Sequence, residues 1–64
     1  RIISPTDSVK DRLAAFYHWR DLQSLEQAIL VAKSKPIDLK NVESWSKREG
    51  KLPEFEKFKR RLEN

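Results

Sequence analysis

The sequence predicts an all-α fold, a small bundle of four short helices that forms one helical unit over residues 1–64. Apolar residues recur at three- and four-residue spacing in four separate stretches, and no stretch alternates with the two-residue period of a β-strand. Proline, serine or aspartate stands near the start of each stretch, where helices begin. A chain of 64 residues makes one small domain, which buries only about 60% of the surface that its unfolded chain exposes.

The first helix is predicted over residues 5–19. Ser4 is a suitable N-cap, Pro5 occupies the first helical position, and Asp7 favours the positive end of the helix dipole. The buried stripe of this helix consists of Val9, Leu13, Phe16 and Tyr17, and Trp19 is expected to close it.

The second helix is predicted over residues 22–34, with Asp21 as its N-cap. One broad apolar face carries Leu22, Leu25, Ala28, Ile29 and Ala32, while Leu30 and Val31 project from the other side. A helix that is apolar more than halfway round is typically buried. The rest of the chain offers little to cover it beyond the two later helices and the Tyr17/Trp19 end of the first. We therefore expect a fragment or subdomain of a larger protein, as the start at Arg1 and the lack of methionine also suggest.

Two further helices are predicted over residues 39–49 and 53–63. Pro36 ends the preceding helix, and Asp38 caps the third, whose buried stripe is Leu39, Val42 and Trp45. Gly50, the only glycine, stands where a left-handed residue ends a helix. Pro53 opens the fourth helix, with Phe55, Phe58 and Leu62 on its buried side. We expect Trp45 to pack against Phe55 and Phe58.

Composition excludes several classes of site. There is no cysteine, and His18 is the only histidine, so neither a thiolate nor a histidine-cluster metal site is predicted. Glycine-rich phosphate loops are absent, and the longest apolar run, residues 28–32, is too short for a membrane span. We expect no catalytic residue, metal or cofactor in this chain, no membrane association and a cytoplasmic location, with which a cysteine-free composition is compatible.

Two charged pairs are candidates for positioning a phosphate or a partner: Arg20-Asp21 and Asp11-Arg12. Arg20 also complements the negative end of the first helix, and Asp21 also caps the second, so a structural role is favoured for this pair. Asp11 and Arg12 point about 100° apart, so they cannot chelate one ligand together. A solvated face and a face that meets another domain are both open for them, since Ala14 and Ala15 permit close approach.

A net charge of +4 permits contact with nucleic acid. The candidate contacts lie on the third and fourth helices: Lys47, Arg48, Lys57, Arg60 and Arg61. Glutamates at positions 43, 49, 54 and 56 dilute this positive field, so a solvated charged face is favoured over a nucleic-acid site.

Residues 4–50 resemble the helical region that follows the catalytic sheet in small bacterial nucleotidyltransferase-like proteins, among them toxins of abortive-infection toxin–antitoxin systems. The segments that carry the resemblance are Asp11-Arg12-Leu13-Ala14, Arg20-Asp21, residues 25–31, and Asp38-Leu39 with Gly50. The sequence departs from the family where Arg12 replaces the usual lysine and where no clear acidic residue follows Arg20-Asp21. The Gly-Ser and paired-aspartate elements that hold metal and triphosphate in that family are not in this chain.

The resemblance implies a non-catalytic helical subdomain that packs on a catalytic sheet domain. In that setting Arg20 would reach a phosphate, and Asp11 or Asp21 would orient the groups around those that contact it. Two other functions are consistent with the residues: a small basic helical nucleic-acid-binding module, and a helical module for protein interaction or dimerisation. The expected partner is accordingly an N-terminal domain of the same protein or a separate protein, with nucleic acid as the alternative.

Overall fold

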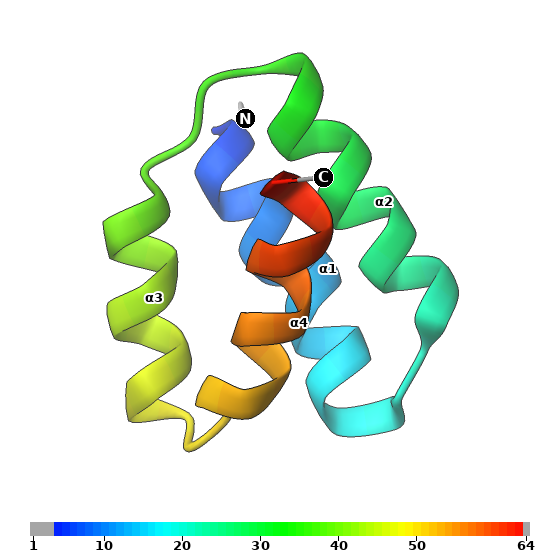
Figure 1. Ribbon diagram of the computed structural model, residues 1–64, viewed down its shortest axis with the longest axis vertical. Coiled ribbons are helices and arrows are strands. Elements are labelled where there is room, and N and C mark those ends of the chain that lie inside the picture. Colours follow the sequence, from blue (N-terminus) through cyan, green and yellow to red (C-terminus); the bar gives the residue numbers. More distant parts are fainter. Residues whose placement is uncertain (1–3, 64) are drawn as a thin grey trace.

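The computed structural model describes residues 4–63 and confirms the all-α fold class (Figure 1). The four helices are α1 (Pro5–Trp19), α2 (Leu22–Ser34), α3 (Leu39–Arg48) and α4 (Leu52–Glu63), and residues 4–63 contain no strand. The bounds of α1 and α2 agree with the predicted ones. The third helix ends one residue earlier than predicted, and the fourth begins one residue earlier.

Side-chain caps begin the first three helices where the sequence predicts them. The Ser4 hydroxyl accepts from the Asp7 N–H at 3.1 Å, and the Asp38 carboxylate accepts from the Asn41 N–H, also at 3.1 Å. Asp21 caps α2 in the same manner. Each cap satisfies a backbone N–H that has no partner within its helix. The caps therefore determine where each of these helices begins.

Gly50 separates α3 from α4 by adopting the left-handed conformation, with φ of 72°. Its N–H donates to the Lys47 carbonyl at 3.1 Å, and the Lys51 N–H donates to the Ser46 carbonyl at 2.9 Å. These two bonds form a Schellman motif, which satisfies the last carbonyls of α3. The next helical hydrogen bond begins at Lys51, whose carbonyl accepts from the Phe55 N–H at 2.9 Å. For that reason α4 starts at Leu52.

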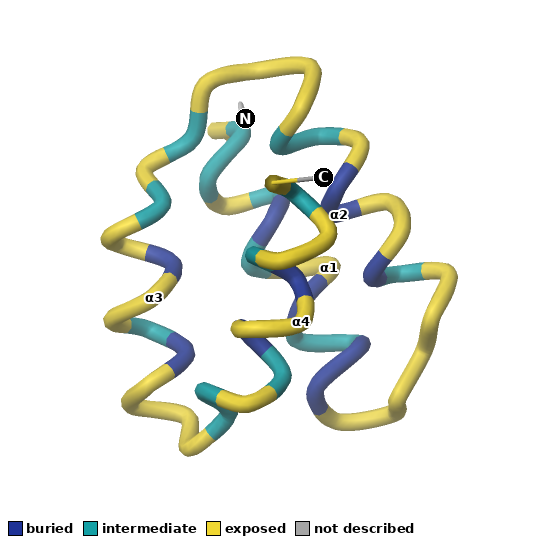
Figure 2. Tube along the Cα trace, viewed as in Figure 1, coloured by how far each residue is buried: buried dark blue, intermediate teal, exposed yellow. Residues whose placement is uncertain are grey.

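Helices α2 and α3 each pack against both α1 and α4. Figure 1 shows α4 lying in front of α1, with α2 on one side and α3 on the other. Figure 2 shows the buried positions of the four helices turned toward the middle of the bundle. The members of this single core are Val9, Leu13, Phe16, Tyr17, Leu25, Ala28, Ile29, Val42, Phe55 and Phe58. Burying one large apolar side chain contributes about 1.5–3 kcal/mol, so this cluster is the main source of stability.

The expectation that α2 is a buried helix, apolar more than halfway round, is confirmed for only part of its apolar surface. Leu25, Ala28 and Ile29 are buried, whereas Leu22 and Leu30 are 67% and 64% exposed. Helices α1 and α4 cover one side of α2, and Leu30 lies about 100° around the helix from Ile29, outside that contact. The apolar excess predicted for α2 is therefore present on the surface of the bundle.

The structure gives Trp45 a different aromatic partner from the predicted one. Its ring stacks on Tyr17, with the centroids 5.5 Å apart and the planes at 24°. Phe55 and Phe58 instead contact one another, with their centroids 6.0 Å apart. Because Trp45 is only partly buried, it covers the edge of the core instead of filling it.

Two hydrogen bonds connect α1 to the α3 segment. The buried hydroxyls of Tyr17 and Ser46 lie 2.7 Å apart, and at the other end of α1 the Thr6 hydroxyl accepts from the Asp38 N–H at 2.9 Å. Ser46 is the one buried polar residue among those that the structure describes. A buried hydroxyl without a partner is costly, so the Tyr17–Ser46 bond favours one register of α3 on α1.

We predict that Tyr17 and Ser46 are energetically coupled. Ser46→Ala leaves the Tyr17 hydroxyl buried without a partner and should lower the free energy of unfolding by about 1–3 kcal/mol. Tyr17→Phe should cost less, because a helical serine can bond a carbonyl of its own helix. Urea unfolding of both single variants and of the double variant measures the coupling, expected at about 0.5–1.5 kcal/mol. Losses that simply add would show that the two hydroxyls do not interact.

Candidate functional site

The corner between α1 and α2 is built around a left-handed residue. Arg20 has φ of 53° and ψ of 39°, and its N–H donates to the Phe16 carbonyl at 2.9 Å, which ends α1. Among residues 4–63, Arg20 is the one residue other than glycine with positive φ. The left-handed conformation costs a residue with a Cβ roughly 1–2 kcal/mol, which is why glycine usually occupies such positions. The predicted role of Arg20 at the end of α1 therefore carries a backbone strain that the sequence did not reveal.

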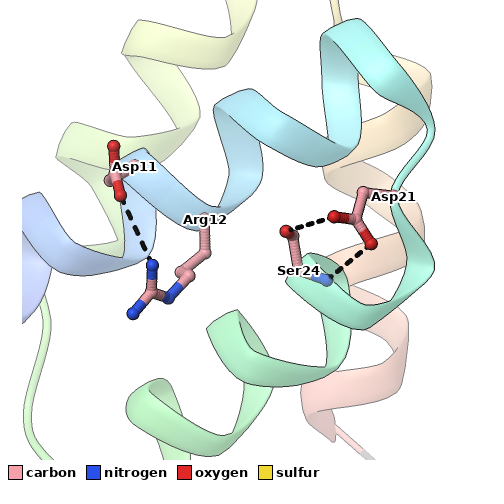
Figure 3. Close-up of polar contacts among 4 residues, drawn as sticks. All are labelled: Asp11, Arg12, Asp21 and Ser24. Carbon is pink, nitrogen blue, oxygen red and sulfur yellow. Dashed lines mark hydrogen bonds and ion pairs between the residues drawn. The ribbon is translucent and has the colours of Figure 1, made fainter.

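Asp21 is fully engaged in capping α2. Its Oδ1 accepts from the Gln23 N–H at 3.0 Å. The same Oδ1 accepts from the Ser24 N–H at 3.3 Å, and the Oδ2 accepts from the Ser24 hydroxyl at 3.0 Å (Figure 3). These bonds support the structural role of Asp21. They also occupy the carboxylate, which forms no ion pair with the neighbouring Arg20 within the part of the chain that the structure describes.

Asp11 and Arg12 form an ion pair with each other on the exposed side of α1, with 3.5 Å between Arg12 Nη1 and Asp11 Oδ2. The long guanidinium side chain turns back across the angle between the two positions. Figure 3 shows this pair and the Asp21–Ser24 contacts as separate interactions. An exposed pair of this kind contributes about 0–1 kcal/mol. The structure thus does not bring the two predicted charged pairs into one site.

The structure instead brings Arg20 together with part of the basic set. A cleft of about 220 Å³ lies between the end of α1, the start of α2 and α4; it is lined by Phe16, Tyr17, Arg20, Leu22, Glu54 and Lys57. A second depression of about 270 Å³ shares two of these residues; it is lined by Leu22, Leu25, Lys57, Arg60 and Arg61. We call these two hollows together the corner groove.

Members of the basic set differ in their surroundings. Arg61 donates to Glu26 at 2.6 Å, an exposed ion pair that links α4 to α2. Within residues 4–63, Lys57 and Arg60 have no ion-pair partner. Lys47 and Arg48 are exposed in the last turn of α3 and line neither hollow. The five predicted nucleic-acid contacts therefore do not form one continuous site.

Tyr17 forms part of the wall of the corner groove, and its hydroxyl is directed to Ser46. Burial raises the pKa of Tyr17 from 10.0 to about 12; the hydrogen bond from Ser46 opposes this shift, and the negative charge of Glu54 adds to it. The phenol is therefore neutral at physiological pH. Its hydroxyl has a structural role, because it is paired with the buried Ser46 hydroxyl.

Trp19 and Leu22 flank the corner and are the residues that the sequence reasoning placed wrongly. Trp19, which was expected to help cover α2, is 80% exposed, and Leu22, which was expected on the buried face of α2, is 67% exposed. A signal was available for Trp19, because position 19 lies about 90° around the helix from the stripe centred on Leu13 and Phe16. Nothing in the sequence predicted that Glu54 and Tyr17 would line the cleft, since this depends on how α4 lies relative to α1.

Among residues 4–63, no group of three or more histidine, aspartate or glutamate side chains comes together in a way that would hold a metal ion. The His18 Nε2 lies 3.9 Å from a Glu49 oxygen, which is a single weak contact between two exposed side chains. No described helix is both long and apolar enough to cross a membrane.

Comparison of the chain with protein-family models, with curated proteins and with solved structures finds no match.

Relief of the strain at Arg20 should stabilise the protein. We expect Arg20→Gly to raise the free energy of unfolding by about 0.5–1 kcal/mol, because glycine adopts positive φ without steric cost. Arg12→Gly is the matched control: Arg12 is helical, so glycine there should cost about 1 kcal/mol. Denaturant melts measure both, and a loss in Arg20→Gly similar to that in Arg12→Gly would contradict a strained left-handed corner.

Alkaline pH should unfold the protein through Tyr17. The unfolded chain releases the phenolic proton near pH 10 and the folded chain near pH 12, so the stability is complete below pH 10 and falls between these values. The expected slope is about 1.4 kcal/mol per pH unit. The difference between the pH profiles of the wild type and Tyr17→Phe isolates this contribution. Parallel profiles above pH 10 would contradict it. Tyr17 is the only tyrosine, so its absorbance titrates without overlap.

Proposed function

We propose that this chain is a non-catalytic helical subdomain that packs against another domain through the corner between α1 and α2. The observation that carries the proposal is the exposure of Trp19 and Leu22, at 80% and 67%, on either side of the Arg20-Asp21 turn. Large aromatic side chains at the surface are typical of the centres of protein interfaces. Exposed apolar area of this kind contributes a favourable free energy only when a partner covers it and removes it from water.

The chemistry of the described residues supports a binding role over a catalytic one. Asp21 is occupied by capping, the Tyr17 hydroxyl is bonded to Ser46, and Asp11 is paired with Arg12. Each of these groups thus has a structural partner, which supports a binding role for the surface around them. The partner suggested by the resemblance of residues 4–50 is a nucleotidyltransferase-like catalytic sheet domain, and the proposed location is the cytoplasm.

A second candidate is binding of nucleic acid. The observation that favours it is the meeting of Arg20, Lys57 and Arg60 around Leu22, which places three cations without ion-pair partners, within residues 4–63, along one groove. Glu54 and Glu26 lie at the same groove or pair with its arginine, which weakens the attraction for a polyanion. A dimer of this chain through Trp19 and Leu22 is a third arrangement of the same surface.

Hydroxyl-radical footprinting read by mass spectrometry tests the proposal. We expect Trp19 to be oxidised several-fold more slowly in the product of the complete reading frame than in the isolated 64-residue chain, because the partner domain covers the indole. Trp45 is the matched internal control, since it lies on α3 and stacks on Tyr17 in both samples. Its rate should not change.

Three results would overturn the proposal. Equal oxidation of Trp19 in the two samples would show that nothing covers the corner. Protection that grows with the concentration of the isolated chain would identify a dimer instead. Protection of the isolated chain by duplex DNA or by an RNA hairpin, lost as salt rises, would establish the nucleic-acid candidate.

A further inference from the structure

The corner groove has a surplus of positive charge beside an apolar surface. Four cationic side chains line it, Arg20, Lys57, Arg60 and Arg61, whereas Glu54 lines it and Glu26 pairs with one arginine. Glu54 lies in the first turn of α4, where a carboxylate is already favoured by the helix dipole. The groove therefore attracts an anion, and Leu22, which lines both hollows and is largely exposed, attracts an apolar group.

Arg20 is held at this groove in spite of its backbone strain. Glycine or asparagine would end α1 at lower cost, since both adopt the left-handed conformation more readily than arginine. A strained residue that lines a cleft is a reason to ask what its side chain contributes. The guanidinium is a rigid fork that matches the two oxygens of a carboxylate. Asp21, its neighbour, cannot supply that carboxylate because it caps α2.

The sizes of the two hollows fit side chains of a protein segment. They measure about 220 and 270 Å³ and share Leu22 and Lys57, so one segment can fill both with successive side chains. A nucleic-acid backbone presents evenly spaced phosphates and would bring some of them close to Glu54 or Glu26. A protein segment avoids this repulsion because its acidic and apolar side chains can be placed separately.

We infer that the corner groove receives an acidic, amphipathic segment of the partner domain, with one aspartate or glutamate between Arg20 and Lys57 and an apolar side chain against Leu22. This inference rests on the proposed docking of the α1–α2 corner and specifies the chemistry of the partner. Arg20 and Lys57 bind the carboxylate, and the apolar contact excludes water from this ion pair. Exclusion of water strengthens the pair relative to one at the open surface.

The test measures docking by the protection of Trp19 in the product of the complete reading frame. Arg20→Asn removes the guanidinium but keeps a residue that tolerates positive φ, and Lys57→Gln removes the second cation. We expect each substitution to reduce the docking equilibrium constant by about tenfold at low salt, with a smaller effect at high salt. Lys47→Gln is the matched control: it removes a cation of α3 outside the groove and should change docking less than twofold.

The outcomes separate the inference from the function on which it rests. If Trp19 is unprotected in the wild-type protein, both are wrong. If Trp19 is protected but Arg20→Asn and Lys57→Gln dock as the wild type does, docking stands and the acidic segment is wrong. Equal losses in Lys47→Gln would indicate general electrostatic attraction and would also overturn the inference. Thermal melts of each variant verify that α1 and α4 remain folded, so that a loss of docking reflects the missing charge.

Discussion

The hydroxyl of Tyr17 needs a partner inside the bundle, and much of the structure depends on how that requirement is met. The ring is buried between Phe16 and Trp45, and the oxygen lies 2.7 Å from the Ser46 hydroxyl. The observed placement of α3 on α1 brings Ser46, the one buried residue of the polar class among residues 4–63, to that oxygen. Apolar packing alone tolerates small shifts between helices, whereas a buried hydrogen bond does not.

The same residue connects the core to the surface where a partner would dock. Tyr17 is nearly covered, yet together with Phe16 it lines the cleft that Arg20 and Lys57 border. A change that moves the ring would therefore alter both the packing of α3 and the shape of the cleft. Because α4 carries Lys57 one position before the fully buried Phe58, the position of the cation is likewise determined by the core. The core and the proposed docking surface thus share residues in this small protein.

The helix caps and helix ends could be predicted from the sequence, whereas the contacts between helices could not. Ser4, Asp21, Asp38 and Gly50 act through bonds within a few residues, so their roles can be read from the neighbouring sequence. The two hollows are different, because one forms where α4 meets the end of α1 and the start of α2, and the other where α4 packs on α2. How α4 packs on α1 and α2 depends on side chains that are distant in the chain. Such packing gives no periodic pattern in a single sequence.

The candidate site shows the same division in more detail. Arg20 and Lys57 were each candidates, but for separate sites on separate helices, and their common cleft follows from tertiary structure alone. Trp45 was expected on the phenylalanines because they are close in sequence across Gly50, whereas its ring stacks on Tyr17, a residue distant in sequence. Local reasoning favoured the near partner. The contact between α1 and α3 joins distant segments, and there the buried Tyr17–Ser46 hydrogen bond helps to determine which residues meet.

The strain at Arg20 and the exposure of Trp19 have a common physical meaning. Both raise the free energy of the isolated bundle, the first through the backbone and the second through apolar surface in water. The free energy of unfolding of so small a domain is only several kcal/mol, so two such costs together are a substantial fraction of it. Binding at the corner would offset the second cost and give the guanidinium a partner. Trp19 and Arg20 are adjacent in the chain, at the corner beside the groove. That adjacency favours a docking surface over two unrelated unfavourable features.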